Sequence, residues 1–535
     1  MTQSSAEAIA KGLAAAGCRH AFGMPGGEVL VLLDALEAAG ISFTLCKHEN
    51  AAGFMAEGSW HATGAPGVLL TTIGPGLANA TNSVANALQE QVPMIVLSGC
   101  IAPEQASQFT HQVIDQSALM APITKATFQV ADGNAAVVIE KALAIALADP
   151  PGPVHVDLPD IFAKRPAHKT ASLARPTYRS PAASAAIKEA ADCLRNAQRP
   201  LILSGIGAVL HDAGSAIDAF SAKHEIPVIT TYKAKGIVPE RNALALGGHG
   251  LSPLSDKYIL PLLESSDCVL CLGYDPIEMR SGWKQPWHGS AALEFVHAQI
   301  EHGMHGSRLR HVCDIQSAVR GLDKELGAPL DGHWQDAQWV DVLLQLSKEF
   351  GARPDWGAHQ VFDALNQRLS DDAVVTVDSG AHRILLTQMF HCNRPGHLLQ
   401  SAAFCTMGVA VPLAIGHKIA KPEVPVVAVV GDAGLDMVAG DLATLRDTKL
   451  PLTIVVLVDG SLALISKKQA LMQLAANGVD FGETDFVMLA KAYGGIGKSV
   501  EDAQSLQDAL EEAARQDRFT ILACRIDASN YDGAF

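Results

Sequence analysis

The stretch GVLLTTIGPGLANATNSVANALQEQVPMIVLSG, residues 67–99, decides the fold class. It begins as an uninterrupted apolar run, turns through Gly74-Pro75-Gly76, continues as an Ala-rich helical pattern and returns after Val92-Pro93 to a second apolar run. Short continuous apolar runs that alternate with helical patterns are typical of parallel strands covered on both faces. The stretch therefore predicts a β-α-β unit.

A second stretch, PVVAVVGDAGLDMVAGDLATLRDTKLPLTIVVLVDG at 425–460, follows the same order. Gly74 lies 19 residues before Pro93, and Gly431 lies 20 residues before Pro451. Two interpretations stay open. Any two β-α-β units look alike, or an ancient duplication produced two halves that face each other across a ligand.

The length and two shifts in composition indicate several domains. A chain of 535 residues has a prior of about three to four domains. Segments at about 165–185 and 326–339 look like linkers. We therefore predict an α/β fold with three doubly wound parallel-sheet domains, over residues 1–165, 186–328 and 350–535.

Composition excludes some classes of protein. Apolar residues at 48% and charged residues at 18% indicate a folded globular chain. With 40 Lys and Arg against 56 Asp and Glu, the net charge of −16 argues against nucleic acid and anionic membranes as partners. We see no signal-peptide pattern and no apolar run of membrane-spanning length, so we expect a soluble cytoplasmic protein.

Ten cysteines are spread singly along the chain, which fits reduced thiols. Cys268 and Cys271 form the one close pair, inside an apolar run that reads as a buried strand. Alternation along a strand would point the two side chains to opposite faces. Core packing is therefore favoured over a zinc site.

Ligands of open parallel sheets bind beyond the carboxyl ends of the strands. Four apolar runs end there in informative residues: Glu49, the Gly74-Pro75-Gly76 turn, Asp432 and Asp459. If the strands before Asp432 and Asp459 are adjacent, the two carboxylates converge, which favours Mg²⁺ and a diphosphate. The alternative is that both are helix N-caps, which are common at such turns.

The middle segment contains a Gly-x-Gly turn, Gly205 to Gly207, between a predicted strand and a predicted helix. This pattern alone is a weak signal for a dinucleotide. A glycine needed only for close packing of helix on strand is the alternative.

Five motifs together resemble a known family. GDAGLDMVAGDLATLRDTKLPLTIVVLVDGSLALI resembles the thiamine-diphosphate motif, which begins Gly-Asp-Gly and ends in an Asn pair. With FGMPGGEV, HEN, IGPGLANATN and CTMGVAVPLAIG, it makes nearly the whole chain similar to the acetolactate synthase branch of thiamine-diphosphate enzymes. The resemblance implies a pyrimidine-binding first domain, a central Rossmann-like domain and a third domain that binds diphosphate and Mg²⁺.

Carried over, the resemblance places Asp432, Asp459 and the backbone carbonyl of Ser461 on Mg²⁺. The sequence departs from the motif twice: Ala433 replaces its second Gly, and Val458-Asp459 replaces the Asn pair. Asp459 still offers an oxygen ligand and the extra methyl of Ala433 is small, so we expect cofactor binding to survive.

The resemblance also implies roles around the organic cofactor. Glu49 would hydrogen-bond its pyrimidine ring and support the proton relay that activates it. His382 would reach the diphosphate, with a solvated loop His as the alternative. Cys405 and Met407 would offer backbone groups to the pyrimidine, and Met407 would wedge under the cofactor. The residues expected to hold the cofactor are Glu49, Gly74, Pro75, Asn79, His382, Cys405, Met407, Gly431, Asp432, Ala433, Gly434, Asp459 and Ser461.

On the substrate side, FTHQVIDQSALMAPITK is similar to the active-site stretch of acetolactate synthases and of benzaldehyde lyase. The likeness places Gln112 near the reacting carbonyl as a donor. Glu28, in MPGGEV, would handle substrate protons, with an exposed turn residue as the alternative. No adjacent His-His pair occurs, which argues against the simple pyruvate decarboxylase type.

Two positions differ from the biosynthetic synthases. Lys467 and Lys468 stand where those enzymes have a large aromatic residue, so we expect a pocket that prefers a polar or carboxylate-bearing substrate. Asp275 falls about where they have a flavin-contacting Arg, and FAD is therefore disfavoured.

The expected function is a homodimeric or homotetrameric 2-oxoacid decarboxylase or carboligase that depends on thiamine diphosphate and Mg²⁺. The alternatives are a 2-hydroxyketone lyase of the benzaldehyde lyase type and a non-catalytic regulatory homologue. An NAD-dependent dehydrogenase would need a fuller Gly-x-Gly-x-x-Gly fingerprint than this chain has.

Overall fold

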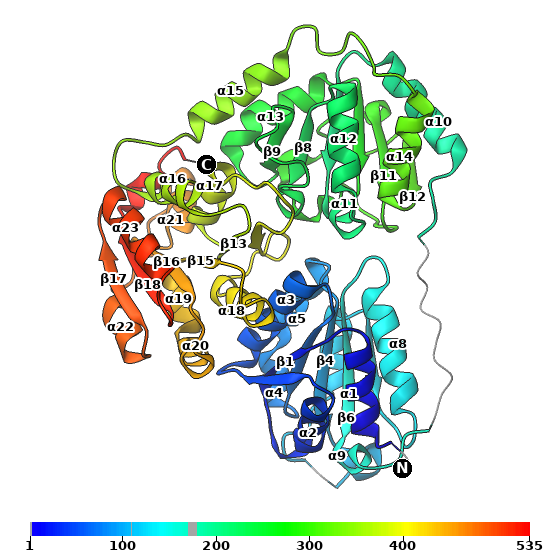
Figure 1. Ribbon diagram of the computed structural model, residues 1–535, viewed down its shortest axis with the longest axis vertical. Coiled ribbons are helices and arrows are strands. Elements are labelled where there is room, and N and C mark those ends of the chain that lie inside the picture. Colours follow the sequence, from blue (N-terminus) through cyan, green and yellow to red (C-terminus); the bar gives the residue numbers. More distant parts are fainter. Residues whose placement is uncertain (1–2, 109, 169–178, 535) are drawn as a thin grey trace.

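Three α/β domains, each built on a six-stranded parallel sheet, make up the chain in a computed structural model that describes residues 3–108, 110–168 and 179–534 (Figure 1). The predicted fold class is confirmed. Of the linker expected at about 165–185, residues 169–178 lie outside the described residues. The domain boundaries at 165, 186, 328 and 350 stay predictions.

The first domain has its strands in the order β2 (Ser42–Leu45), β1 (His20–Met24), β3 (Gly67–Thr71), β4 (Met94–Cys100), β6 (Pro153–Pro159) and β5 (Ala126–Gln129). Its helices are α1 (Ser5–Ala15), α2 (Leu30–Ala38), α3 (Glu49–Thr63), α4 (Pro75–Asn79), α5 (Thr81–Gln89), α6 (Pro103–Ala106), α7 (Gln116–Met120), α8 (Ala135–Leu147) and α9 (Asp160–Ala163). The central strands are buried on both faces, as continuous apolar runs require.

The central domain orders its strands β12 (Leu309–Val312), β11 (Ala292–Val296), β10 (Cys268–Leu272), β7 (Pro200–Ser204), β8 (Val228–Thr231) and β9 (Ala245–His249). Its helices are α10 (Ser184–Asn196), α11 (Ile206–Leu210), α12 (Gly214–His224), α13 (Pro253–Ser265) and α14 (Ile315–Leu326), and α15 (Gln338–Glu349) leads on to the third domain. Cys268 and Cys271 belong to different cores on opposite faces of this sheet, as strand alternation predicts.

The third domain orders its strands β14 (Leu398–Gln400), β13 (Val374–Val377), β15 (Val426–Gly431), β16 (Thr453–Val458), β18 (Thr520–Arg525) and β17 (Ile496–Val500). Its helices are α16 (Ala358–Arg368), α17 (Ala381–Met389), α18 (Ala410–Ala420), α19 (Asp432–Val438), α20 (Leu442–Thr448), α21 (Ala463–Leu471), α22 (Phe486–Ala492) and α23 (Ala503–Ala513). Taken in chain order, these six strands repeat the arrangement of the first domain, which favours the duplication.

The two similar domains meet through equivalent helices. Helix α3 precedes β3 in the first domain, α18 precedes β15 in the third, and the two helices pack together (Figure 1). Their backbones approach so closely that only glycine fits. A Cβ atom on Gly58 would lie 2.2 Å from the carbonyl oxygen of Leu413, and one on Gly416 would lie 1.9 Å from that of Met55.

Shared apolar cores join the domains. One core contains Phe54 and Met55 of α3 together with Leu413 of α18. Another contains Leu203 of the central sheet together with Leu385 of α17. The third domain therefore packs on both of the others. Within the described residues, no helix has the length and apolar character needed to cross a membrane.

Replacing Gly416 with Ala should loosen the contact between α3 and α18. The added methyl must displace backbone, and overpacking of this kind costs about 1–3 kcal/mol. We expect a lower thermal midpoint for Gly416→Ala by calorimetry. Gly440→Ala is the control, because a Cβ there would meet nothing nearer than 4.0 Å. Equal midpoints for the two variants would contradict the close approach.

Candidate active site

A cavity of about 210 Å³ opens at the carboxyl ends of β15 and β16, and among the residues that the structure describes its lining comes from the third domain alone. It contains nine of the residues predicted to hold the cofactor: His382, Cys405, Met407, Gly431, Asp432, Ala433, Gly434, Asp459 and Ser461. The remaining lining residues are Ser379, Gly380, Ala381, Leu457, Leu462, Ala463, Leu464 and Ile465. The ends of β15 and β16 and the N-terminus of α19 thus meet at one edge of the sheet, as expected for parallel strands.

Asp432 and Asp459 converge in this cavity, because their strands are neighbours in the sheet. Asp432 Oδ2 accepts hydrogen bonds from the backbone N–H groups of Asp459, at 3.1 Å, and Gly460, at 2.7 Å. The N-caps of α19 and α21 are Gly431 and Leu462. The helix-capping alternative for the two Asp residues is therefore wrong.

Ionisation of the two carboxylates is disfavoured in this cavity. Burial and the nearby charge of Asp432 raise the pKa of Asp459 to about 7, and burial raises that of Asp432. A divalent cation between the two oxygens would relieve both effects, and carboxylates are the ligands that Mg²⁺ prefers. The donor set therefore fits the metal that the motif implies.

Two buried polar atoms in the lining have no partner in the structure: His382 Nε2 and Ser379 Oγ. Burial, together with the charge of Arg383, lowers the pKa of His382 to about 4, so its ring is neutral. A neutral imidazole and a hydroxyl are hydrogen-bonding groups for phosphate oxygens. Ser379 was missed in the sequence, although it lies two residues after the end of β13, at the sheet edge where Asp432 follows β15.

Glu49 is the first residue of α3 and is almost fully buried. Its Oε2 accepts a hydrogen bond from Asn79 Nδ2 at 3.0 Å. Gly76 leaves space for this carboxylate, since a Cβ there would lie 3.1 Å from Glu49 Oε1. The structure thus brings Glu49, Asn79 and the 74–76 turn together at one sheet edge of the first domain.

The turn at Gly74 is fixed by a hydrogen bond to the side chain of Gln116. Gly74 has φ 65°, and its N–H donates to Gln116 Oε1 at 2.7 Å. Gln116 Nε2 donates to Asp157 and to the carbonyl of Gly99. Gln116 could not be recognised from the sequence, because a single Gln at the start of a short helix matches no motif.

Gln112 and Glu28 lie at the same edge. A Cβ on Gly74 would lie 2.2 Å from the Gln112 carbonyl oxygen, while the Gln112 side chain is exposed. Glu28 Oε1 accepts from Thr72 Oγ1 and from the N–H of Ile73, the latter at 2.8 Å. The Glu28 carboxylate is therefore fixed against the end of β3, and it is only partly exposed.

The first-domain residues do not line the third-domain cavity, so this chain presents two groups of predicted site residues. Lys467 and Lys468 do not line it either. Lys467 forms an ion pair with Asp532, and Lys468 is exposed on α21. The expected effect of these lysines on substrate choice stays a prediction.

The Gly-x-Gly turn of the central domain is filled by neighbouring protein. A Cβ on Gly207 would lie 2.1 Å from His297 Nδ1, and one on Gly205 would lie 2.6 Å from the Gly273 carbonyl oxygen. Close packing therefore accounts for both glycines. Asp275 is buried beside this turn and accepts a hydrogen bond from Gln91 at 2.8 Å.

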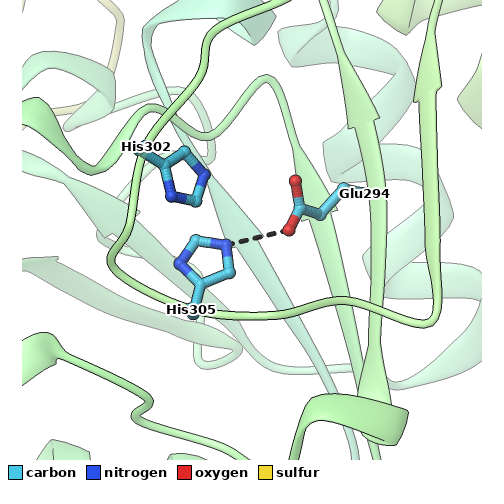
Figure 2. A group of neighbouring side chains, drawn as sticks. All are labelled: Glu294, His302 and His305. Carbon is cyan, nitrogen blue, oxygen red and sulfur yellow. Dashed lines mark hydrogen bonds and ion pairs between the residues drawn. The ribbon is translucent and has the colours of Figure 1, made fainter.

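A group of potential metal ligands in the central domain, among the residues that the structure describes, consists of Glu294, His302 and His305 (Figure 2). His305 Nε2 lies 2.8 Å from Glu294 Oε1. Arg310 contacts the other two potential ligand atoms: its Nε lies 3.0 Å from Glu294 Oε2, and its Nη2 lies 2.8 Å from His302 Nε2. The guanidinium already neutralises the carboxylate and would repel a cation, so this is an ion-pair cluster.

Comparison with known proteins identifies three matching family models. Residues 3–119 match the N-terminal TPP binding domain of thiamine pyrophosphate enzymes, 187–322 the central domain and 378–524 the C-terminal TPP binding domain. The chain is 30% identical over 539 residues to the acetolactate synthase of Bacillus subtilis (strain 168), covering 98% of this chain and 93% of that protein.

Other relatives show the same full-length match. The probable acetolactate synthase large subunit of Methanocaldococcus jannaschii is 29% identical, covering 98% of this chain and 92% of the relative. The catabolic acetolactate synthase of Raoultella terrigena is 27% identical, covering 98% and 95%. The likeness therefore extends over all three domains.

Asp459→Asn should raise the melting temperature of the cation-free protein. It should also reduce the increase in melting temperature that Mg²⁺ causes. The pKa of Asp459 is raised on folding, so the stability of the cation-free wild type falls as pH rises from the ordinary Asp range to about 7. At pH 8 the variant lacks this penalty, so its melting temperature without Mg²⁺ should be higher than that of the wild type. Calorimetry with and without Mg²⁺ tests this, with the exposed Asp508→Asn as control. An unchanged Mg²⁺ response in Asp459→Asn would exclude the metal role.

Proposed function

Because the chain belongs to the family of thiamine pyrophosphate enzymes, we propose that it is a 2-oxoacid decarboxylase or carboligase of the acetolactate synthase type that depends on thiamine diphosphate and Mg²⁺. The observation that carries the proposal is the third-domain cavity. It combines two converging carboxylates for a cation with the unpartnered His382 and Ser379 for an anion.

In this proposal the third domain holds the charged end of the cofactor. Asp432, Asp459 and the Ser461 carbonyl bind Mg²⁺, and His382 and Ser379 hydrogen-bond the diphosphate. Gly434 leaves no room for a larger residue, because a Cβ there would lie 2.1 Å from Asp378 Oδ2. When bound, thiamine diphosphate supplies an electron sink for breaking and forming the bond next to a carbonyl.

Glu49 holds the proton that the chemistry needs. Its burial keeps water away from the carboxyl group, and the bond from Asn79 Nδ2 to Oε2 leaves Oε1 to face the cofactor ring. Gln112 donates to the substrate carbonyl, and Glu28, fixed by Thr72 and Ile73, exchanges protons with the substrate. The substrate is a small 2-oxoacid, and a second carbonyl compound or a proton is the acceptor.

We propose a reaction without FAD. An acidic residue, Asp275, stands at the position where the flavin-binding relatives would need a cation, and it is committed to Gln91. The packing of His297 and Gly273 on the Gly-x-Gly turn supports the same conclusion, because a phosphate group requires close access to such a turn.

We further propose that the active unit is at least a homodimer. The cavity is lined by the third domain only, and Glu49 has to come from a first domain. Exposed apolar side chains lie on α19, on α21 and just after α21, and a second copy would cover them: Met437, Ile465, Leu471, Met472 and Leu474. A twofold dimer gives two equivalent sites, each with residues from both chains.

The cofactor role is tested by calorimetry on the purified chain with thiamine diphosphate. Binding should require Mg²⁺ and disappear in EDTA, and Asp432→Ala should abolish it. Glu49→Gln should keep cofactor binding and lose roughly 10²–10⁴-fold in kcat, because the amide cannot exchange a proton. Equal affinity in EDTA would refute the metal-linked site.

Sharing of sites between chains is tested by co-expressing Glu49→Gln and Asp432→Ala with different tags. Each variant alone should be inactive. If a site combines Glu49 of one chain with Asp432 of its partner, the mixture should regain about a quarter of the wild-type activity, since half of the dimers are mixed and each has one intact site. No recovery in purified mixed dimers would place both groups in one chain.

The reaction type is decided by products. CO₂ release from a panel of 2-oxoacids, with analysis of the coupled product, supports a decarboxylase or carboligase. Cleavage of a 2-hydroxyketone without CO₂ would indicate the lyase. Cofactor binding without turnover of either class would indicate a regulatory homologue.

A further inference from the structure

Three polar side chains of the first domain form a ladder along one face of α5. Asn82, Asn86 and Glu90 are spaced four residues apart, which places them on the same side of a helix. All three contact the segment from Ser401 to Thr406 of the third domain. This segment leads directly into Met407 and contains Cys405, both in the lining of the cavity.

The contacts are specific in distance and direction. Asn82 Nδ2 donates to Thr406 Oγ1 at 3.1 Å, and Ser401 Oγ donates to Asn86 Oδ1 at 2.7 Å. Glu90 Oε1 accepts from the backbone N–H groups of Ala403, at 2.8 Å, and Phe404, at 3.1 Å. The ladder therefore binds both side chains and backbone of the loop.

The central domain of the chain also contacts the ladder. Glu90 is buried, and its Oε2 lies 3.1 Å from Nζ of Lys233, which belongs to the central domain and whose side chain is 5% exposed. Burial by itself lowers the pKa of Lys233, but Glu90, Glu278 and Asp275 together raise it, so the lysine is charged. The Lys233 ammonium group thus lies against Glu90 Oε2, while Glu90 Oε1 accepts the loop N–H groups.

The far end of the same loop is fixed by a second buried carboxylate. Asp378 accepts from the N–H groups of Gly408, at 3.0 Å, and Val409, at 2.8 Å. Between the two anchors Cys405 has φ 55°, in the left-handed region that a cysteine rarely adopts. Such a conformation persists only where the surroundings impose it.

We propose that Asn82, Asn86 and Glu90 are positioning residues, which hold the 401–407 loop and the strained Cys405 in the shape that receives the pyrimidine half of the cofactor. This rests on the proposed function for the identity of the cofactor. It adds a second task for the first domain: besides supplying Glu49 to a site, it shapes the third-domain wall of the cavity in its own chain.

If the active unit is a dimer with shared sites, each first domain then acts on both of them. Glu49 contributes to one site, and the α5 ladder shapes the other. Loosening the ladder in one chain should therefore impair the site that uses Glu49 of the partner chain.

The test uses the full-length chain with Glu90→Gln and Asn82→Ala. The first variant keeps the side-chain shape but removes the charge, and the second removes the bonds to Thr406 and, within the first domain, the bond to Asn50 Oδ1. Hydrogen exchange of the cofactor-free protein, measured by mass spectrometry on the peptide covering 401–407, reports directly on the stability of the loop's hydrogen bonds. We expect exchange in Glu90→Gln to be about 10- to 100-fold faster, as for loss of hydrogen bonds to a charged group.

Binding provides the second readout. The dissociation constant for thiamine diphosphate with Mg²⁺ should rise roughly tenfold or more in both variants, while the KM for the 2-oxoacid changes little. The matched control is Gln91→Asn. Gln91 is equally buried beside Glu90 and bonds across domains to Asp275 and His297, but not to the loop.

The proposal is overturned if exchange of 401–407 and cofactor affinity in both ladder variants match those of Gln91→Asn. Should Glu90→Gln fail to fold, Asn82→Ala decides alone, since its side chain lies at the partly exposed end of the ladder. A wild-type chain that binds no thiamine diphosphate would refute the proposed function, whereas the exchange rates measured without cofactor would still report on the ladder.

Discussion

The backbone contact between α3 and α18 is the constraint on which the rest of the structure depends. Side chains normally keep two helices 8–10 Å apart. Here Gly58 and Gly416 remove that spacing, and each faces a carbonyl oxygen of the other helix. The first and third domains are thereby fixed at one distance, which brings α5 within hydrogen-bonding reach of the loop that follows Ser401.

Buried charges at the domain junctions act on geometry more than on stability. Burying an ion pair costs desolvation free energy that largely offsets its Coulomb attraction. The side chains of Glu90 and Lys233 are nonetheless only 5% exposed, and the other oxygen of Glu90 binds backbone N–H groups of the 401–407 loop in the third domain. The pair therefore serves mainly to hold that loop in one position.

The central domain shows that a shared fold does not determine which ligand a domain binds. Its strand, Gly-x-Gly turn and helix follow the pattern of nucleotide-binding domains, but His297 fills the space over Gly207. The same domain instead supplies Lys233 to the α5 ladder and Asp275 to Gln91. Its polar residues thus serve the junction with the first domain.

The sequence by itself determined the class of fold, the opposite orientation of Cys268 and Cys271, and the sheet edge at which Asp432 and Asp459 lie. Each follows from local rules, namely strand alternation and the common edge of parallel strand ends. The convergence of Asp432 with Asp459 required β15 and β16 to be neighbours, which only the structure decided. Only the tertiary structure decided what the face of Asn82, Asn86 and Glu90 contacts, and that Gln116 holds Gly74. The spacing of residues fixes the face of an element, but the partner of that face depends on how segments more than 300 residues apart pack together.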